Sequence, residues 1–449
     1  MRIGNRCGFG ARALLCFTIS LGACGGESDR MAEPEPPGGE PGLRTRDLAG
    51  YGDDLDGAVR IHDRVWQARG TANAQLVTTS DGHVLIDTGL PTQRRLARQI
   101  REAAPGPIRR IVLTHAHADH YGATSRFADA DTEIIVHAQF PHNQRYLKAL
   151  APLLMQRNKI FFPDDMPKVP GAAIGLLARM YPTVEPTTLV HDRYEFVQGD
   201  VRFQVLAMPG AEGADGLCVW LPDHGILFTG DFFGHIFPMW PNLVTIRGER
   251  PRYALPYVES LNLLLELDPK MIVPSHFEPI VGREQIREGV IRTRDAVLYV
   301  HDAVIEGMNE GKDVHTLMRE ISLPPELQVP EVHGKVSWGV RSIFEAYLGW
   351  FHLRSATELY AVPPWAVHPD LVELAGGADP VVDRARTHLS AGRPLEALHL
   401  VEVALAAEPE HDGANAIRVE ALELLLERSG EVNHYETYWL RHRIDTLRD

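Results

Sequence analysis

The sequence contains few cysteines and no excess of positive charge. Only four of its 449 residues are cysteines, and Cys218 stands alone beyond the first 24 positions. A disulfide-bonded scaffold is therefore excluded, and no structural disulfide is expected. The formal net charge of −15 argues against a general binder of nucleic acid or of anionic membranes, because neither surface attracts an acidic protein.

The N-terminal segment has the features of an export signal. Three arginines precede the apolar run "ALLCFTISLGA", which is too short to span a bilayer. The run ends in "LGAC", which resembles the lipobox of bacterial lipoproteins, so residues 1–23 would be a signal peptide and Cys24 the lipidated residue; an ordinary signal peptide cut nearby is the alternative. Residues 24–48, rich in Gly, Pro and Glu, are expected to be a flexible tether. The expected location is the cell envelope of a bacterium, as a periplasm-facing lipoprotein held to the membrane by its lipid only.

From residue 49 to residue 285, short β-rich runs alternate with helical stretches. The segment "AQLVTTSDGHVLIDTG" predicts two strands around an Asp81-Gly82 turn, and "TQRRLARQIREAA" predicts an amphipathic helix with Leu96 and Ile100 on its apolar side. Several further strand candidates end in polar residues able to bind metal; these candidates are "IRRIVL", "TEIIVHA", "RYEFV", "VRFQVLAMPG", "LCVWLP", "GILFTGD" and "MIVPSH". Polar chemistry gathered at the ends of many strands is typical of an α/β scaffold.

After residue 285 the pattern changes to helix. The segment that begins with "REQIREG" keeps apolar residues at helical spacing and is expected to stop at Gly311. The last part, from "DRARTHLSAGRP" to "LELLLERSG", has the pattern of a tetratricopeptide-like helical pair, and a plain helical bundle is an equal alternative. Residues 286–449 are therefore predicted to form an all-α domain.

The stretch "LTHAHADHYG", residues 113–122, places His115, His117, Asp119 and His120 within six positions. In an extended segment the imidazoles of His115 and His117 can point to one side. Asp119 and His120 would point to the other side, because the chain turns there. Such an arrangement can divide its ligands between two metal ions. The alternative, a run of surface histidines, fits poorly with the apolar strand that leads directly into the cluster.

The motif "THAHADHYGA" resembles the HxHxDH signature of the metallo-β-lactamase superfamily. "LIDTG", "IVHA", "FTGD" and "PSH" follow in the order that the superfamily uses, so the resemblance covers about residues 57–280. It implies an αββα sandwich with a dinuclear, usually zinc, site along one edge. The predicted fold is therefore an α/β sandwich with its catalytic domain over residues 49–285, followed by the all-α domain.

One departure from the superfamily pattern points to a particular branch. Many members carry a histidine directly after Pro-Gly, whereas this sequence reads "MPGAEG", with Ala211 in that place and Glu212 next. Alanine cannot bind metal, and the alkylsulfatases, secreted or periplasmic hydrolases of alkyl sulfate esters, read Pro-Gly-Thr-Glu here. The segments "RDAVLYVHDAVIEGMNEG", "LPPEL", "YLGWF" and "LVELAGGADPVV" also resemble the helical dimerisation domain of that branch, which implies a homodimer.

This resemblance implies a full set of zinc ligands. The ligands are, for one ion, His115, His117 and Glu212; for a second, Asp119, His120 and His276; and, bridging the two, Asp231. Asp215, three residues after Glu212, is a nearby alternative to that glutamate. Carboxylates beside imidazoles suit zinc, and three protein ligands per ion leave positions open for water, as a catalytic site requires. The expected cofactors are two Zn²⁺ ions.

The resemblance also implies the reaction, which is hydrolysis of an alkyl sulfate or related ester by a metal-bound hydroxide. Two cations lower the pKa of a shared water and neutralise an anionic substrate. The segment "PNLVTIRGE" resembles the branch's Asn-Leu-x-Thr-Leu-Arg-Gly, which makes Asn242 and Arg247 candidates for contact with the sulfate; a surface ion pair is the alternative for Arg247. Asp119 and His235 are the candidate catalytic residues, His235 as a proton donor or as a partner of a ligand.

Apolar residues in two segments, 140–167 and 235–243, are expected to lie in loops near the metal. They can line a pocket for the apolar tail of a small anionic ester, or they can pack the helical domain against the first domain.

Two other functions remain open. The metal pair alone does not choose between alkyl sulfates and a lactone, β-lactam or phosphodiester substrate. The second alternative is a non-catalytic metal-binding lipoprotein of the same fold. Seven ligand side chains argue against it, because binding alone does not require them.

Overall fold

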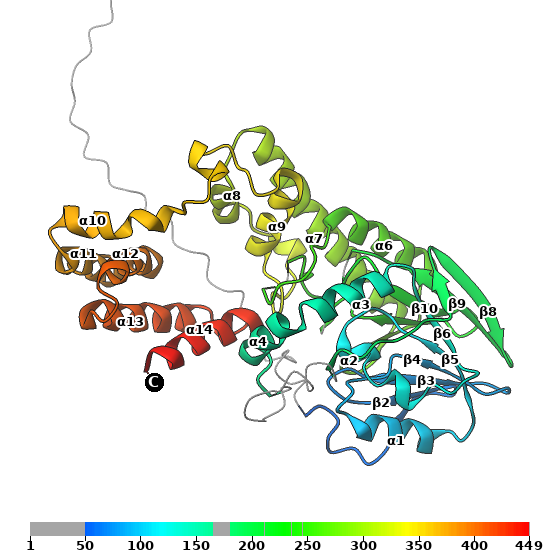
Figure 1. Cartoon of the computed structure of the whole chain (residues 1–449). Coiled ribbons are helices and arrows are strands. Elements are labelled where there is room, and N and C mark those ends of the chain that lie inside the picture. Colours follow the sequence, from blue (N-terminus) through cyan, green and yellow to red (C-terminus); the bar gives the residue numbers. More distant parts are fainter. Residues whose placement is uncertain (1–49, 165–179, 211, 235, 245, 449) are drawn as a thin grey trace, which may run out of the picture. The chain divides into compact units, whose positions relative to one another are not determined.

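The computed structural model (Figure 1) describes residues 50–448 except 165–179, 211, 235 and 245. The predicted signal peptide, tether and lipidation site at Cys24 lie outside the described residues, as do Ala211 and His235. The contacts divide the chain into two units, Met1–Pro37 and Gly38–Asp449, and everything below concerns the second. None of the helices in the described ranges combines the length and the apolar character that crossing a membrane requires.

Seven strands form the first sheet, in the order β1 to β7. Strands β1 to β4 are antiparallel neighbours, whereas β4 to β7 run parallel. The predicted hairpin is present, and Gly82 in its turn has a φ of +74°, which glycine adopts without strain. The strands are β1 (Val59–His62), β2 (Val65–Ala68), β3 (Ala74–Thr78), β4 (His83–Ile86), β5 (Ile108–Val112), β6 (Glu133–His137) and β7 (Thr188–Val190).

Six strands form the second sheet, in the order β13-β12-β11-β10-β9-β8. All neighbours are antiparallel except β11 and β12, which run parallel. The strands are β8 (Arg193–Gln198), β9 (Val201–Ala207), β10 (Leu217–Leu221), β11 (Ile226–Gly230), β12 (Met271–Pro274) and β13 (Ile280–Val281).

The two sheets face each other across a core of β-branched and aromatic side chains. Val77, Ile86 and Val112 from the first sheet and Val205 and Phe228 from the second are at most 1% exposed. Because side chains alternate between the two faces of a strand, the intervening residues form the outer faces of both sheets. Those outer faces are also apolar, so each of them requires a covering layer.

Helices provide these covering layers. Helix α1 (Arg94–Ala103) buries Leu96 and Ile100 against the first sheet, as predicted. Helices α6 (Ala254–Leu267) and α7 (Arg283–Asn309) bury Leu261 and Val297 against the second sheet. The order of layers confirms the predicted αββα sandwich.

The segment 140–167 is mainly helical, so the prediction that it forms a loop was wrong. Helices α3 (Phe140–Ala149) and α4 (Ala151–Phe161) occupy most of its described part. Each helix carries a proline, Pro141 or Pro152, in its first turn. Proline is tolerated there because the first amide groups of a helix have no partner within the helix. These prolines therefore mark helix starts and not loops.

The C-terminal half is helical, as predicted. Helix α7 ends at Asn309, and Gly311 follows with a φ of +80° while its amide donates to the carbonyl of Met308. The other α-helices of this region are α8 (Val314–Glu320), α9 (Val336–Leu348), α10 (His368–Ala375), α11 (Ala378–Ser390), α12 (Pro394–Ala407), α13 (Asp412–Arg428) and α14 (His434–Arg448), with short 3₁₀ turns at Pro325–Leu327, Ala356–Leu359 and Pro364–Val367. A further 3₁₀ turn, Thr124–Arg126, lies between β5 and β6.

One apolar core crosses the predicted domain boundary. The cluster under α6 and α7 continues without interruption from Leu206 of the second sheet to Phe344 of α9. Trp240, fully buried, lies against Gly339 of α9, so the segment 236–243 packs the helical part onto the sandwich. The boundary at residue 285 stays a prediction.

Candidate metal centre

The candidate ligands stand on the short segments that leave the strand ends. His115 and His117 follow β5, Asp231 directly follows β11, and His276 follows β12. The two sheets meet at this point, because the amide of Leu217 in β10 donates to the carbonyl of Thr114, the residue that precedes the first histidine. Loops at one edge of both sheets therefore bring residues more than 150 positions apart into one site.

His115, His117 and Glu212 form one group of possible ligands. Their ligand atoms lie within 4.8 Å of one another. The His115 Nε2 is 2.8 Å from the His117 Nδ1, which in turn lies 3.0 Å from the Glu212 Oε1. Three atoms in this arrangement are suitably placed to share one cation.

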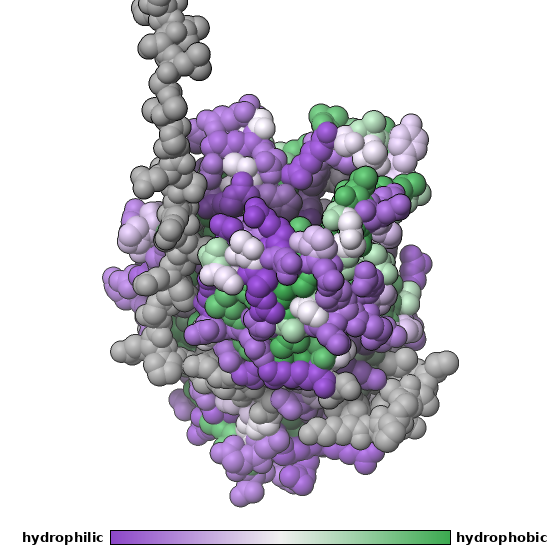
Figure 2. All heavy atoms as spheres, turned by 90° about the vertical axis from the view of Figure 1, so that its left-hand side faces the viewer, coloured by the Kyte–Doolittle hydropathy of each residue, from purple (hydrophilic) through white to green (hydrophobic). Residues whose placement is uncertain are grey.

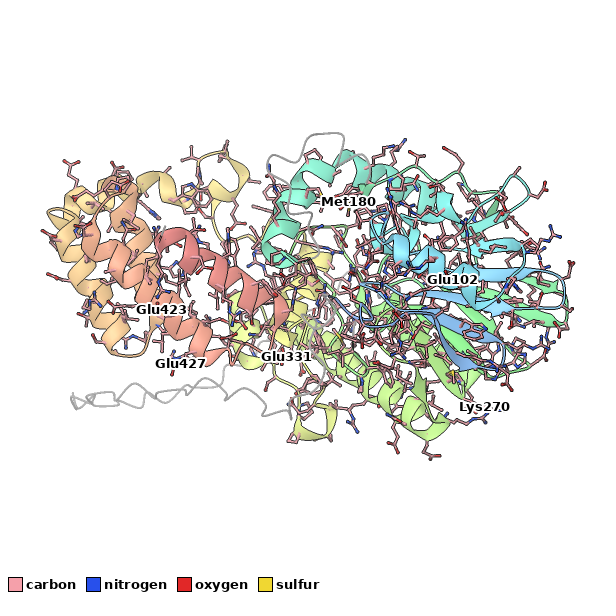
Figure 3. The ribbon with its side chains drawn as sticks, turned by 90° about the horizontal axis from the view of Figure 1, so that it is seen from below. Glu102, Met180, Lys270, Glu331, Glu423 and Glu427 are labelled. Atoms are coloured by element: carbon pink, nitrogen blue, oxygen red, sulfur yellow. The ribbon has the colours of Figure 1, made fainter. Side chains whose placement is uncertain are left out.

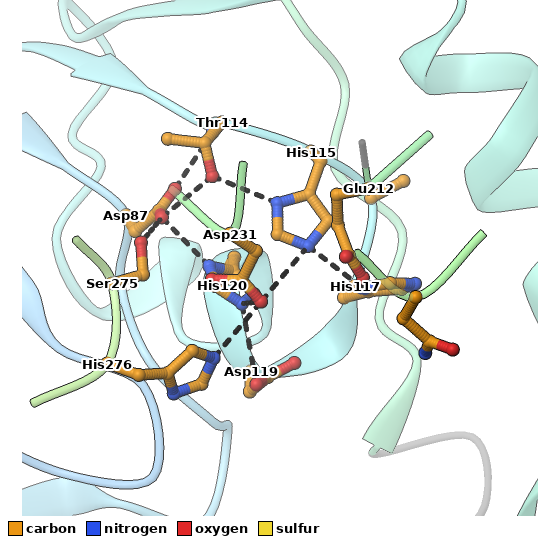
Figure 4. Close-up of polar contacts among 12 residues, drawn as sticks. Asp87, Thr114, His115, His117, Asp119, His120, Glu212, Asp231, Ser275 and His276 are labelled. Atoms are coloured by element: carbon orange, nitrogen blue, oxygen red, sulfur yellow. Dashed lines mark hydrogen bonds and ion pairs between the residues drawn. The ribbon is translucent and has the colours of Figure 1, made fainter. Parts of the chain in front are cut away.

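Asp119, His120 and His276 form a second group, and Asp231 lies between the two groups (Figure 4). Helix α2 (Ala118–Tyr121) carries the first two of these residues. The Asp231 Oδ2 is 3.0 Å from the His276 Nε2, 3.3 Å from the His120 Nε2 and 4.0 Å from the His115 Nε2. This carboxylate therefore faces imidazoles of both groups, and its predicted role as a bridging ligand stays a prediction.

Each of the four imidazoles is held through its other ring nitrogen. The Thr114 hydroxyl contacts the His115 Nδ1 at 3.0 Å, and Glu249 contacts the His117 Nε2 at 3.1 Å. For the remaining two histidines, the outer partners of Nδ1 are the carboxylate of Asp87 for His120, at 2.9 Å, and the carbonyl of Thr71 for His276. Such partners fix the tautomer and leave the inner nitrogen with a lone pair for a metal.

The donor set fits metal ions for a further reason. Among the described residues, none forms a hydrogen bond to the buried Nε2 of His120 or to the buried Oδ1 of Asp231. Buried polar atoms nearly always have a partner, so these two atoms, on side chains 3.3 Å apart, fit a site for a metal ion. Imidazole and carboxylate groups are those that zinc prefers.

The sequence analysis assigned no role to Asp87, the aspartate of "LIDTG". Asp87 is fully buried and accepts four hydrogen bonds, from the amide and the hydroxyl of Thr114, from the His120 Nδ1 and from the Ser275 hydroxyl, all at 2.8 to 2.9 Å. Because the Thr114 hydroxyl donates to Asp87, it must accept from the His115 Nδ1. One carboxylate thus orients two ligands. The available signal was its position directly after a buried strand.

The electrostatics of the centre favour cations. Burial raises the pKa of Asp231, but the charges of His120 and His276 outweigh burial and hold that pKa well below its usual range. Burial lowers the pKa of His120, yet Asp231 and Asp119 raise it well above normal. Where no other cation compensates their charge, the ionised carboxylates therefore favour the protonated form of the imidazoles.

Glu212 and its alternative Asp215 have different surroundings. The Glu212 carboxylate reaches the His117 Nδ1, and both of its oxygens accept from Arg252 at 2.9 Å. Asp215 accepts from the amide of Ala116 at 3.0 Å and from the Asn143 side chain at 2.7 Å, and it belongs to neither ligand group. Asp215 therefore shapes the histidine loop, and Glu212 stands at the centre.

A buried ionic network adjoins the first ligand group. The Arg247 Nε donates to the Glu249 Oε1 at 2.8 Å, and the Arg252 Nη2 donates to the Glu249 Oε2 at 2.9 Å. Arg252 also donates to the carbonyl of Asn242 at 3.1 Å. The sequence analysis selected Asn242 and Arg247 but missed Glu249 and Arg252, although the run "RGERPR" contained the signal.

Glu249 also changes the basicity of the ligand that it touches. Burial lowers the pKa of His117, but the Coulombic attraction of Glu249 and hydrogen bonds to Glu212 and Glu249 raise it to about 10. Burial raises the pKa of Glu249 itself, whereas Arg247 and His117 lower it well below its usual range. Glu249 is therefore a charged group in the wall of the site.

A cavity of about 110 Å³ opens beside the ligands. Its polar lining includes Asp119, Glu212, Asp231, His276 and Arg247. Its apolar lining comes from Leu147, Leu154, Met155, Phe162, Met180 and Tyr181. Figure 3 places Met180 beside the helical segment of α3 and α4. Both uses expected for residues 140–167 are therefore realised in their described part: they line a pocket, and Phe161 at the end of α4 packs against Tyr435 of the helical region.

Comparisons with known proteins agree with this arrangement. Residues 68–276 match the Metallo-beta-lactamase superfamily, and residues 313–443 match the alkyl sulfatase dimerisation family. A linear primary-alkylsulfatase of Pseudomonas sp. is 27% identical over 383 residues, which cover 81% of this chain and 72% of the relative. An alkyl/aryl-sulfatase of Saccharomyces cerevisiae is 26% identical, covering 83% of this chain and 61% of the relative, so the chain spans less than two thirds of that protein.

A solved structure shares the fold. The stereoselective inverting sec-alkylsulfatase from Pseudomonas sp. superposes with a TM-score of 0.76 over 90% of this chain and 67% of that chain, at 23% sequence identity. At this identity the likeness supports the architecture of sandwich and helices. Residues 68–276 therefore form a metallo-β-lactamase superfamily domain and residues 313–443 an alkyl sulfatase dimerisation region, and the chain is homologous to the alkylsulfatases.

Proposed function

We propose that the protein is a dinuclear zinc hydrolase of alkyl sulfate esters. The observation that carries this proposal is one cavity that joins two groups of metal ligands, an arginine and an apolar wall. Homology to alkylsulfatases supports the choice of ester. The substrate would be a small anion with an alkyl tail, and no nucleic acid would be involved.

Each ion would have three ligands of its own, and Asp231 would be shared by both ions. His115, His117 and Glu212 would hold one ion, and Asp119, His120 and His276 the other. When bound, the ions supply an acidified water as nucleophile and neutralise charge on the ester. The residues of the chain orient these ligands and exclude bulk water from the buried side of the site.

The substrate would lie with its head group toward Arg247 and its tail along α4. Arg247 is 19% exposed and lines the cavity, whereas Arg252 is 3% exposed and is held by Glu212 and Glu249. A guanidinium group suits the oxygens of a sulfate. The side chains of Leu154, Met155 and Phe162 supply an apolar surface for the tail.

Zinc content and turnover of decyl sulfate test this function together. We expect two zinc ions per chain and release of inorganic sulfate from decyl sulfate. Arg247→Ala should keep the zinc and lower kcat/KM by at least about a hundredfold, because it removes a charged contact to the head group. Val197→Ala, a change at an exposed site on β8, is the control.

Other outcomes would decide between the alternatives. If the protein binds two zinc ions and hydrolyses a lactone, β-lactam or phosphodiester but not decyl sulfate, that compound class would replace alkyl sulfates as the proposed substrate. A purified protein that binds zinc and cleaves none of these esters would be a metal-binding protein without catalysis. Absence of bound zinc would contradict both hydrolase proposals.

We also propose a homodimer formed through the helical region. Of the 23 large apolar side chains that are exposed among the described residues, eleven lie between residues 347 and 374. Trp350 is 72% exposed and Leu374 is 83% exposed. Figure 2, which views the molecule from the left side of Figure 1, shows apolar patches on an otherwise hydrophilic face. The match of residues 313–443 to a dimerisation family supports this assembly.

Finally, we propose that the protein is a lipoprotein of the bacterial envelope that faces the periplasm. The motif "LGAC" before Cys24 supports this location. Mass spectrometry of the mature N-terminus in a bacterial host tests it. A diacylglyceryl group on Cys24 is expected, and an unmodified N-terminus at another residue would contradict the proposal.

A further inference from the structure

One carboxylate, that of Glu249, contacts the candidate metal ligand His117 and two arginines. Its Oε2 lies 3.1 Å from the His117 Nε2 and 2.9 Å from the Arg252 Nη2. Its Oε1 lies 2.7 Å from the Arg247 Nη2. The side chain of Glu249 is only 8% exposed and lines the cavity. A buried carboxylate in this place pairs with the Arg247 guanidinium, which would otherwise be available to the substrate anion alone.

We infer that Glu249 determines specificity, because it limits the anion pocket to head groups that carry a single negative charge. The inference rests on the proposed function and deepens it. Alkyl sulfates would be accepted, and phosphate monoesters and other dianionic esters of the same tail would be discriminated against.

The charges of the pocket wall support this inference. Two guanidinium groups, of Arg247 and Arg252, face two carboxylates, of Glu212 and Glu249, so the four side chains of this network carry no net charge. The two terminal nitrogens of Arg252 donate to both Glu212 oxygens, to one Glu249 oxygen and to the carbonyl of Asn242, whereas its buried Nε has no hydrogen-bond partner among the described residues. Arg247 is the more exposed of the two arginines and would meet a head group, and its charge is already shared with Glu249.

A second charge on the head group would meet Glu249 and not a guanidinium. A sulfate monoester carries one negative charge, whereas a phosphate monoester carries about 1.5 to 2 at neutral pH. In a buried site of low dielectric, repulsion between the Glu249 carboxylate and a second negative charge a few ångströms away is weakly screened. Glu249 would therefore weaken the binding of a dianionic head group more than that of a monoanionic one.

The probes for the test are two ligands that hydrolysis cannot cleave. Decyl sulfonate is a monoanion, and decyl phosphonate is a dianion at about pH 9. Their dissociation constants are measured by calorimetry with the zinc-loaded full chain and excess zinc, and the zinc content of each variant is measured in parallel. The wild type should bind the sulfonate more tightly than the phosphonate.

Glu249→Gln removes the charge and keeps an oxygen that accepts from the His117 Nε2. We expect the affinity for the phosphonate to rise at least tenfold more than the affinity for the sulfonate. Glu249→Asp keeps the charge and should keep the wild-type preference. The matched control is Glu133→Gln, which removes a carboxylate paired with Arg110 at 2.7 Å outside the cavity and should change neither affinity.

Two results would overturn the inference: an unchanged preference in Glu249→Gln, or the same relaxed preference in Glu249→Asp. Because neither probe is cleaved, the result does not depend on turnover. If decyl sulfate is not hydrolysed but Glu249→Gln shifts the preference, the proposed substrate fails and this inference stands. If decyl sulfate is hydrolysed and the preference does not shift, this inference alone fails.

Discussion

The buried carboxylate of Asp87 connects the ligands to both sheets. It follows β4 of the first sheet, and it accepts from Ser275, which follows β12 of the second sheet. Through Thr114 and His120 it reaches one histidine of each ligand group. A group that orients ligands from outside affects the metal without touching it.

We expect Asp87→Asn to weaken zinc binding by about 10- to 100-fold. The amide would present an N–H group toward donors that Asp87 now satisfies, so one buried donor would lose its acceptor. Zinc affinity is measured by competition with a chelating indicator, and circular dichroism checks the fold. Asp223→Asn, in an exposed pair with Arg202, should leave the affinity unchanged. Wild-type zinc affinity in a folded Asp87→Asn protein would contradict this role.

Residues near the ligand motif could be predicted from the sequence, whereas their partners could not. His115 and His117 follow one apolar strand closely, and Asp231 directly follows another. The ends of strands at one edge of a sheet lie close together whatever path the loops take. Glu249 and Arg252 reach the site from an irregular loop after Arg247. No periodicity in the sequence fixes the path of such a loop, so their pairing required the structure.

Secondary structure shows the same division between what periodicity indicates and what it does not. Every predicted strand between residues 74 and 276 is present, because alternating or continuous apolar runs are strong signals. The helices α3 and α4 were missed because aromatic residues and prolines at 140–152 obscured their periodicity. The pocket-lining residues of this segment were therefore predicted, but the helices that position them were not.

Helix α14, at the C-terminal end of the chain, contacts the wall of the site. The His434 Nε2 donates to the carbonyl of Phe161 at 2.7 Å, and the Asn433 side chain donates to the carbonyl of Glu331, which Figure 3 labels. Tyr435 beside it is 1% exposed and packs against the ring of Phe161. The end of α4 is therefore held between the sandwich and α14.

Acid should weaken this contact through His434. Burial, together with the nearby charge of Arg247, lowers the pKa of His434 from 6.5 to about 4. The neutral imidazole is the form that fits, so the stability it contributes is present above pH 6.5 and is lost as the pH falls toward 4. The free energy of unfolding should fall by roughly 3 kcal/mol from this group over that interval.

Urea unfolding at several pH values tests this effect. His434→Gln should be less stable than the wild type at neutral pH, but it should lose less stability between pH 6.5 and pH 4. His399→Gln, at a side chain that is 82% exposed, should behave like the wild type. An identical pH dependence in His434→Gln and the wild type would show that the titrating group lies elsewhere.

The chain as a whole carries its apolar surface unevenly. The core of the second sheet runs on into α9, where Phe344 is buried, and the exposed apolar residues begin only three positions later, at Tyr347. Loops and short helices between α9 and α11 carry the rest of that surface. Exposed apolar side chains gathered in one part of the chain are typical of an interface, and in the proposed homodimer a second copy would bury them.

Two charges placed on this surface should prevent dimer formation. We expect the wild type to be a dimer by light scattering at micromolar concentration, and Trp365→Glu combined with Leu374→Glu to be a monomer. Burying two carboxylates without partners costs more than the remaining contacts contribute. Val197→Glu, which adds a charge at a side chain 64% exposed on β8, should remain dimeric. A monomeric wild type would contradict the proposed homodimer, and a double variant that stays dimeric would place the interface away from residues 347–374.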